Sequence, residues 1–144
     1  MRIETLFANN RKWSLSVRRK EPKFFQKLSR LQRPQFLWIG CSDSRVPANE
    51  ITGLLPGELF VHRNVANMVY SSDLNCLSVL QYAIEVLKVK YIIVCGHYDC
   101  GGVKAVVGSS KLGEADAWLK SIRDIMAHNL PALKRIKIKS ERID

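Results

Sequence analysis

The 144-residue chain contains no apolar run that approaches the roughly 20 residues needed to cross a bilayer. Its first residues, MRIETLFANNRKW, also lack the apolar core of a secretory signal. Internal repeats, low-complexity tracts and Gly/Ser linkers are absent as well. We therefore expect no membrane segment, and we expect a single globular domain that resides in the cytoplasm.

Acidic residues are scarce, with 13 Asp and Glu against 23 Lys and Arg, and the net charge is +10. The excess is confined to the two ends: residues 1–35 carry a net +8, residues 36–130 a net −1 and residues 131–144 a net +3. A basic, amphipathic end is more typical of a solvated helix face than of a nucleic-acid surface. Nucleic acid is thus not the expected partner. The alternative is that the basic end binds RNA or an acidic surface.

Cysteine is also sparse, with four residues at positions 41, 76, 95 and 100. Without an export signal, these residues do not predict a disulfide framework, and metal binding or burial is the expected role of each. We interpret Cys76, inside a predicted helix, and Cys95, inside a predicted strand, as buried structural residues. His62 and His128 have no evident partner in the sequence.

Short apolar segments alternate with helix-like segments along the chain. Strands are predicted at residues 35–40, 58–62 and 91–95, and the last (YIIVC) has the composition of a central strand covered on both faces. Helices are predicted over residues 2–30, with breaks near 9–10 and 22, after residues 100–102, and over 114–129. A further helix is predicted to begin at residue 72 or 73, and its apolar face consists of Leu74, Leu77, Leu80, Ile84 and Leu87. This alternation predicts an α/β fold with a parallel β-sheet flanked by helices, in which ligands bind beyond the carboxyl ends of the strands.

Two loops lie where predicted strands end, at residues 41–45 (CSDSR) and 96–102 (GHYDCGG). His97 and Cys100 are three residues apart and can reach one ion, and Cys41 supplies a third soft ligand if the two strand ends are neighbours. One His and two Cys form a known catalytic zinc set with an open fourth position. The alternatives are ordinary burial of the cysteines and a Cys–His nucleophile pair that uses Cys41.

Asp43 and Arg45 lie two residues apart on the same loop as Cys41, so that a short charge-assisted pair is sterically easy. An arginine that holds a carboxylate beside a metal orients it and restrains its attack on the ion. The alternative is an ordinary salt bridge within the loop.

Together with residues 58–67 (ELFVHRNVAN), the two loops resemble the β-class carbonic anhydrases, and the likeness is dense from about residue 38 to residue 107. The resemblance implies the α/β fold of that family, with a helical arm at the N-terminus. It also implies that Cys41, His97 and Cys100 hold one Zn²⁺ per chain.

For the chemistry, the resemblance implies that Asp43 and Arg45 form the catalytic dyad of a carbonic anhydrase, a lyase. The expected reaction is the reversible hydration of carbon dioxide to bicarbonate and a proton. Zinc supports such a reaction because it lowers the pKa of a bound water to about 7.

Trp38, Val46 and Arg63 resemble the members of a bicarbonate pocket that regulates a subset of the family. In that subset the residue at the position of Asp43 becomes a conditional fourth zinc ligand and shuts the enzyme off. The alternative is that Trp38 is a core residue and that Arg63 pairs with a nearby acid.

The resemblance further implies one domain over residues 1–144, with a helical arm (1–34), a zinc-binding α/β core (35–130) and a basic tail (131–144). In the family the arm wraps around a second subunit, so a homodimer or higher homo-oligomer is expected. Relative to the family, we expect the C-terminal sheet strand and helices to be missing from these 144 residues. The alternative function is therefore a truncated, inactive relative that binds zinc structurally, or an acidic partner through its basic N-terminal segment.

Overall fold

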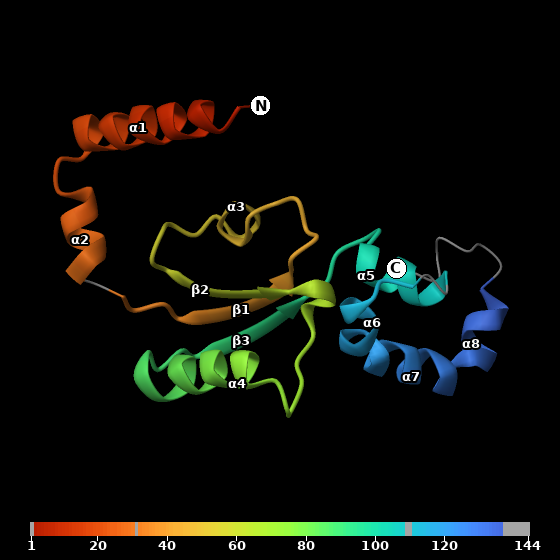
Figure 1. The fold of residues 1–144 in the computed structure, drawn as a ribbon. Coiled ribbons are helices and arrows are strands. Elements are labelled where there is room, and N and C mark those ends of the chain that lie inside the picture. The colour runs from red at the N-terminus through yellow and green to blue at the C-terminus, as the bar shows by residue number, and fades with distance from the viewer. Residues whose placement is uncertain (1, 31, 109–110, 137–144) are drawn as a thin grey trace. The chain divides into compact units, whose positions relative to one another are not determined.

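The computed structural model describes residues 2–30, 32–108 and 111–136. The chain divides into two compact units, Met1–Arg33 and Pro34–Asp144, and each is described by itself (Figure 1). Among the helices of the described residues, none combines the length and the apolar character needed to cross a membrane.

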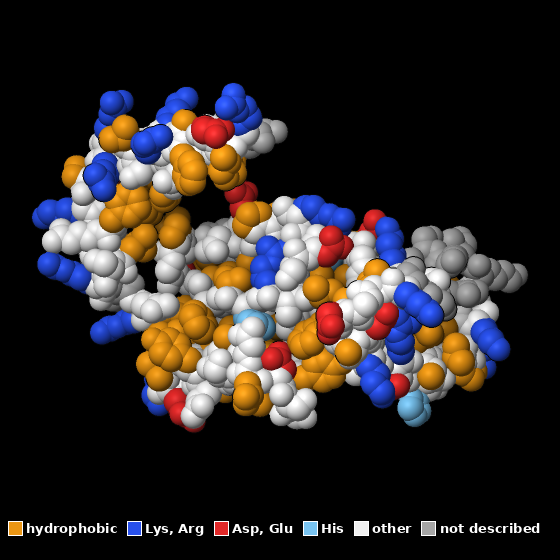
Figure 2. Space-filling model, in the orientation of Figure 1, with side chains coloured by type: hydrophobic (Ala, Val, Ile, Leu, Met, Phe, Trp, Pro, Cys, Tyr) orange, Lys and Arg blue, Asp and Glu red, His pale blue; other side chains and the backbone are white. Residues whose placement is uncertain are grey.

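The first unit consists of helices α1 (Ile3–Lys20) and α2 (Phe24–Arg30). The predicted break near residues 9–10 is wrong, because asparagine lowers helix stability only modestly and α1 continues through both residues. The break near Pro22 is confirmed, since proline cannot continue the hydrogen bonding of a helix. Figure 2 shows Lys and Arg side chains gathered over this unit, interleaved with apolar ones.

The second unit is built on three parallel strands, β1 (Phe36–Cys41), β2 (Leu59–Asn64) and β3 (Tyr91–Cys95), in the order β2-β1-β3. The predicted α/β fold with a parallel sheet is confirmed. Cys41 is the register partner of Asn64, and its neighbour in β1 pairs with Cys95, so the carboxyl ends of all three strands meet at one edge. This edge carries the residues that the sequence analysis selected.

The central strand is β1 and not β3, which corrects the prediction for residues 91–95. β1 is buried over five of its six residues, whereas β3 lies at the edge of the sheet in the described part of the chain. Its apolar side chains are partly open to solvent, with Tyr91 59% and Val94 54% exposed. Composition alone does not report which neighbour covers a strand.

Helices cover both faces of the sheet, as Figure 1 shows for α3 (Ala48–Thr52) and α4 (Leu74–Gln81). Because side chains alternate along a strand, Leu37 and Ile39 pack with the buried residues of α4 and of the π-helical turn η2 (Tyr82–Val86) that continues it. Trp38, between them in sequence, packs on the other face against Ala48 of α3, a helix that the sequence did not predict.

The predicted apolar face of the helix after residue 73 is only partly right. Asp73 is its N-cap, as expected, but Leu74 is 80% and Ile84 is 50% exposed. The fully buried side chains are the small ones, Cys76 and Ala83, which let the helix approach the sheet closely. The wider π-helical turn also shifts the positions that follow it relative to a regular 3.6-residue repeat.

The rest of the unit lies beyond the carboxyl edge of the sheet and contains α5 (Gly101–Val107), α6 (Glu114–Trp118), α7 (Lys120–His128) and α8 (Leu130–Arg135). The helix predicted over residues 114–129 is thus interrupted at Leu119, which is completely buried. Of the predicted basic tail, residues 131–135 belong to α8, and residues 137–144 lie outside the described residues.

Candidate metal centre

Cys41, His97 and Cys100 converge beyond the carboxyl ends of β1 and β3. Cys41 ends β1, His97 lies two residues after β3, and Cys100 is the N-cap of α5. One ligand atom from each residue lies within 4.8 Å of the other two. The two sulfur atoms are 3.7 Å apart, which fits the edge of about 3.8 Å that a tetrahedral ion with Zn–S bonds of about 2.3 Å requires.

The imidazole of His97 is oriented for a ligand. Its Nδ1 lies 2.9 Å from the carbonyl oxygen of Tyr98, which can only accept, so Nδ1 carries the proton and Nε2 keeps a lone pair. Within the described residues, this Nε2 is the buried side-chain nitrogen or oxygen atom that has no hydrogen-bond partner. Such an atom is rare in proteins, and a bond to a cation would satisfy it.

The two thiols differ in their electrostatic surroundings. Burial alone would raise the pKa of Cys41, but the backbone N–H groups of Asp43 and Ala66, 3.4 and 3.2 Å from its sulfur, help to lower that pKa below its usual value. Burial raises the pKa of Cys100, against the backbone N–H of Val103, and the sulfur of Cys41 raises it further. The donor set therefore contains one thiol with a lowered pKa and one with a raised pKa, and both must lose their protons when a metal binds.

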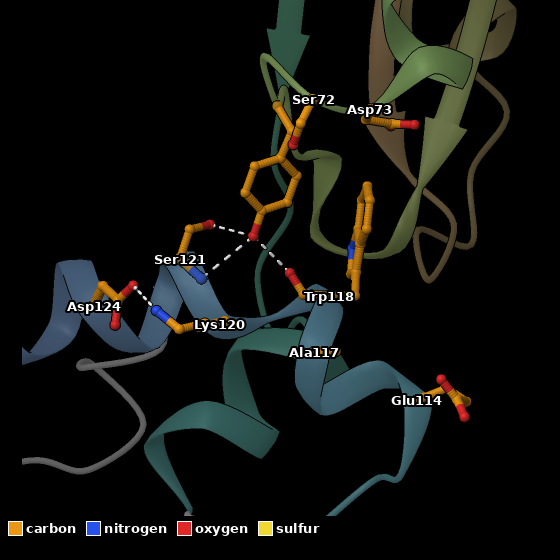
Figure 3. A pocket seen from close by; sticks show the side chains of 9 residues that line it. Ser72, Asp73, Glu114, Ala117, Trp118, Lys120, Ser121 and Asp124 are labelled. Atoms are coloured by element: carbon orange, nitrogen blue, oxygen red, sulfur yellow. Dashed lines mark hydrogen bonds and ion pairs between the residues drawn. The ribbon is translucent and has the colours of Figure 1, made fainter.

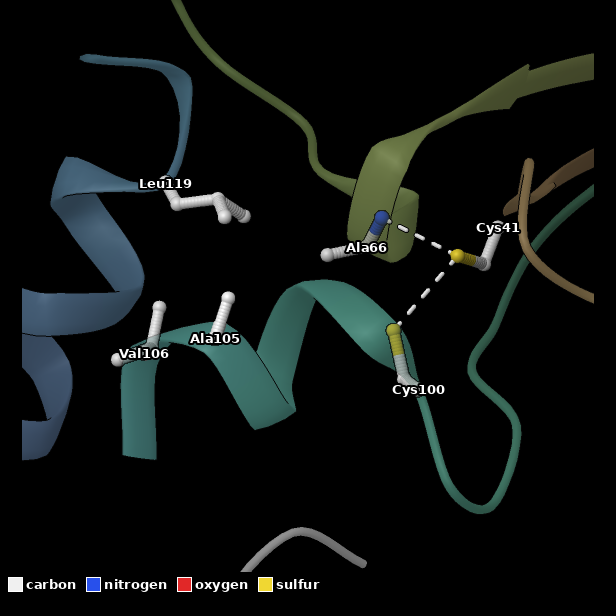
Figure 4. Packing of buried hydrophobic residues seen from close by; sticks show 6 residues of the cluster. All are labelled: Cys41, Ala66, Cys100, Ala105, Val106 and Leu119. Carbon is white, nitrogen blue, oxygen red and sulfur yellow. Dashed lines mark hydrogen bonds between the residues drawn. The ribbon is translucent and has the colours of Figure 1, made fainter. Parts of the chain in front are cut away.

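The N–H of Ala66 is aimed at Cys41 by the short turn η1 (Val65–Asn67), as Figure 4 shows. Two side chains fix this turn. Asn64 brackets it, because its Oδ1 accepts from the N–H of Met68 at 2.6 Å and its Nδ2 donates to the Met68 carbonyl at 2.7 Å. Trp118 donates from Nε1 to the carbonyl of Val65 at 2.8 Å.

Asn64, Ala66 and Trp118 were missed by the sequence analysis as supports of the site. Asn64 and Ala66 belong to the motif at residues 58–67, so the signal was present without an indication of their role. Nothing in the local sequence of Trp118 indicates a bond to a residue 53 positions away.

Asp43 lies beside the three ligands and is held at both carboxylate oxygens. Its Oδ2 accepts from the N–H of Gly101 at 2.8 Å, and its Oδ1 lies 3.4 Å from Nη2 of Arg45. The Gly101 N–H, and then the charge of Arg45, lower the pKa of this carboxyl group, so it is ionised at neutral pH. A Cβ on Gly101 would come within 3.2 Å of Oδ2, so the absence of a side chain there leaves room for the carboxylate.

The residues of the predicted bicarbonate pocket take different positions. Arg63 donates from Nε to the carbonyl of Cys41 at 2.8 Å and from Nη2 to the carbonyl of Ser44 at 2.6 Å, so it braces the loop after β1. Trp38 is buried next to Gly40, whose register partner is Arg63, and Val46 is exposed. The pocket stays a prediction, and the guanidinium of Arg63 is engaged with backbone carbonyls.

A cavity of about 410 Å³ opens beside the ligands and is large enough for a small substrate. It is lined by Ala66, Asn67, Gly96, His97, Tyr98, Cys100 and Val103.

Comparison with known proteins places this arrangement in a family. The family profile described as carbonic anhydrase matches residues 36–144. The chain is 50% identical to a carbonic anhydrase of Emericella nidulans over 141 residues, which is 98% of this chain, and 49% identical to one of Candida albicans over 117 residues, which is 78%. It spans 62% and 41% of the lengths of these two relatives.

Solved structures agree with the sequence relatives. One of two tetrameric β-carbonic anhydrases from Sordaria macrospora matches with a TM-score of 0.92 and 39% identity, covering 97% of this chain and 72% of that one. The β-carbonic anhydrase CafA of Aspergillus fumigatus matches with a TM-score of 0.91 and 38% identity, covering 97% of this chain and 67% of that one. The fold, the profile match over most of the chain and these relatives show that the chain belongs to the β-class carbonic anhydrases.

Proposed function

We propose that this chain binds one Zn²⁺ through Cys41, His97 and Cys100 and catalyses the reversible hydration of carbon dioxide to bicarbonate and a proton. The observation that carries the proposal is the buried, unpartnered Nε2 of His97 beside two sulfur atoms that are 3.7 Å apart. The proposal is supported by the family to which the chain belongs and by the curated relatives, which are named carbonic anhydrases.

Bound zinc would supply a Lewis acid that makes water a nucleophile near neutral pH. The chain's own contribution centres on Asp43, whose carboxylate is ionised and held beside the ligands. Because the N–H of Gly101 occupies Oδ2, we assign Oδ1 to accept a hydrogen bond from the attacking water and to orient it. Arg45 orients this oxygen and helps to keep the carboxyl group of Asp43 ionised.

The decisive measurement determines zinc content and carbon dioxide hydration on the same purified 144-residue chain. We expect one zinc ion at this centre and a hydration rate that is lost together with the metal. The alternative, a relative that holds zinc structurally or binds an acidic partner through its basic end, predicts zinc without hydration. Such a result would reject the catalytic proposal and leave the metal centre intact.

The first prediction concerns the ligands. Replacing His97 or Cys100 with Ala removes one of three protein ligands, so both zinc content and thermal stability should fall, since the free energy of metal binding contributes to folding. Elemental analysis and thermal unfolding check this. Cys95→Ala, which removes a thiol outside the cluster, should keep its zinc. Full zinc retention by both ligand variants would refute the assignment.

Two further parts of the proposal concern organisation. Residues 1–34 act as an arm for a second subunit and residues 35–130 carry the zinc centre. Apolar side chains exposed on α1, such as Leu6, Phe7 and Trp13, support a partner for the arm. The predicted cytoplasmic location and the predicted regulation by bicarbonate stay predictions.

A further inference from the structure

A second group of three ligand side chains lies apart from the centre at Cys41. It consists of His62 in β2, Asp73 at the N-cap of α4, and Cys76 in the first turn of α4. One ligand atom from each lies within 4.8 Å of the other two, the same criterion that Cys41, His97 and Cys100 meet. In the sequence alone, His62 has no evident partner and Cys76 is interpreted as a structural residue.

The fold explains why these three side chains meet. Ile39 of β1 is the register partner of His62, and Ile39 packs against Cys76, so His62 lies on the sheet face that α4 covers. Asp73 and Cys76 are three residues apart and lie on the same side of the helix. The first centre is built in the same way, with Cys41 from a strand and with His97 and Cys100 three residues apart.

Two of the side chains are secluded, and few hydrogen bonds engage the ligand atoms of the group. His62 is 8% exposed and Cys76 is completely buried. Asp73 caps the helix through Oδ1, which accepts from the N–H of Asn75 at 3.0 Å, and among the described residues no hydrogen bond to its Oδ2 is present. In the described part of the chain, no hydrogen bond to the sulfur of Cys76 is present, so a cation at this sulfur would displace no existing bond.

Asn64 sets the tautomer of His62. Its amide orientation is fixed by Met68, so it presents Nδ2 as a donor to Nε2 of His62 at 3.3 Å. Nε2 therefore holds a lone pair, and the hydrogen bond that a cation would replace is a long one. The same Asn64 supports the turn at Ala66, so this residue connects the surroundings of the two groups.

Asp73 is the member of this group that borders a cavity. This residue lines a cavity of about 580 Å³ together with Tyr70, Trp118 and the carboxylates of Glu114 and Asp124 (Figure 3). Lys120 pairs with Asp124 at 2.9 Å and offsets that charge. The remaining carboxylates, Asp73 and Glu114, favour the approach of a cation over that of an anion.

We propose that His62, Asp73 and Cys76 form a second metal site, which takes a divalent cation of borderline softness such as Zn²⁺ or Co²⁺. Imidazole and thiolate donors suit these ions, whereas Mg²⁺ and Ca²⁺ require mostly oxygen donors. A thiolate and a carboxylate also neutralise the two charges of the cation, which lowers the cost of burying it.

The test counts zinc ions per chain by equilibrium dialysis against buffered zinc and elemental analysis, at mildly alkaline pH. The wild type should bind two ions per chain, whereas Cys76→Ser and Asp73→Asn should bind the second ion at least about tenfold more weakly. Asparagine is as good an N-cap as aspartate, so Asp73→Asn keeps the helix start and tests the carboxylate alone. Cys95→Ser, which removes a thiol outside both groups, is the matched control and should bind two ions.

The first centre serves as an internal control for folding. A Cys76→Ser protein that retains one zinc ion is folded, and if it retains none, the Asp73→Asn protein decides. A wild type that saturates at one ion, or an Asp73→Asn protein that binds the second ion as tightly as the wild type does, overturns the proposal. The expected count of two ions rests on the zinc centre of the proposed function, whereas the weaker second binding in the Asp73→Asn protein is measured without reference to carbon dioxide hydration.

Discussion

The carboxylate of Asp43 is held on two sides, by the backbone N–H of Gly101 and by the guanidinium of Arg45. The two contacts differ in kind. The N–H belongs to the first residue of α5 and cannot be removed by changing a side chain, whereas Arg45 is 67% exposed and contributes through its side chain alone. Arg45 is thus the point at which the orientation of Asp43 can be altered without changing a metal ligand.

We predict that Arg45→Ala keeps its zinc and loses catalysis by at least about 100-fold, the lower range for a positioned acid–base group. Zinc should stay because Cys41, His97 and Cys100 are unchanged. Elemental analysis and the hydration rate on one sample check both parts. Arg45→Lys, which keeps the positive charge, should recover part of the rate. A wild-type rate in Arg45→Ala would show that the pair is only a salt bridge of the loop.

At the residue scale, the sequence allowed prediction of the ligand side chains that come together but not of the residues that support them. The three soft ligands carry a recognisable spacing, and the structure brings them together. Ala66 acts through its backbone N–H, and the side chain of Asn64 bonds to the backbone of Met68. Hydrogen bonds that involve backbone atoms leave little trace in a sequence. The sequence did not show that His62 and Cys76 are neighbours, because their proximity depends on the strand register, which is known only once the sheet is known.

At the scale of elements, α6 and the loop before it are fastened by Asp116. Its Oδ2 accepts from the N–H of Leu112 at 2.8 Å, and its Oδ1 accepts from Nη2 of Arg123 in α7 at 2.6 Å. The Leu112 N–H, and then Arg123, lower the pKa of this carboxyl group. Its pKa is therefore lower in the folded than in the unfolded protein, and its contribution to stability is present at neutral pH.

We predict that this contribution is lost as the pH falls from the ordinary carboxyl pKa of about 4 through the lower folded value. Asp116→Asn lacks the titrating group, so it should melt at a lower temperature than the wild type at neutral pH, and the difference should shrink below about pH 4. Thermal unfolding over a pH series measures it. A difference that is constant with pH would show that the charge of Asp116 is unimportant.

The elements themselves were predicted well where local sequence decides them and poorly where neighbours do. The apolar residues 91–95 and the cap at Asp73 were placed correctly by composition and capping rules. The position of β3 at the sheet edge, and the burial of Ala83 in place of Ile84, follow from packing between distant segments. A regular helical repeat also cannot anticipate the π-helical turn at Tyr82–Val86.

At the scale of the whole molecule, apolar side chains remain open on both compact units. They include Leu6 and Trp13 of α1 and Tyr91 and Val94 of β3. Exposed apolar side chains are common at subunit contacts, and the matched Sordaria macrospora enzymes are described as tetrameric.

We predict that the chain forms at least a dimer at micromolar concentration. Multi-angle light scattering gives the mass directly, and a mass of 16.4 kDa at all concentrations would contradict the prediction. Replacing Leu6 and Trp13 with Ser should weaken the assembly, whereas replacing the exposed Arg2 with Ser should leave it unchanged.

The turn that aims an N–H group at Cys41 has a conformational cost. Ala66 adopts a left-handed backbone with φ of 65°, and Asn67 follows with φ of 44°. Asparagine tolerates this region, but alanine loses about 1–2 kcal/mol there. The strain persists because the sulfur of Cys41, the bracket of Asn64 and the indole of Trp118 hold the turn from three sides. The strained conformation of residues 65–67 is the one that aims the Ala66 N–H at the sulfur of Cys41. Relaxing this strain would therefore remove one of the contacts that lower the pKa of Cys41.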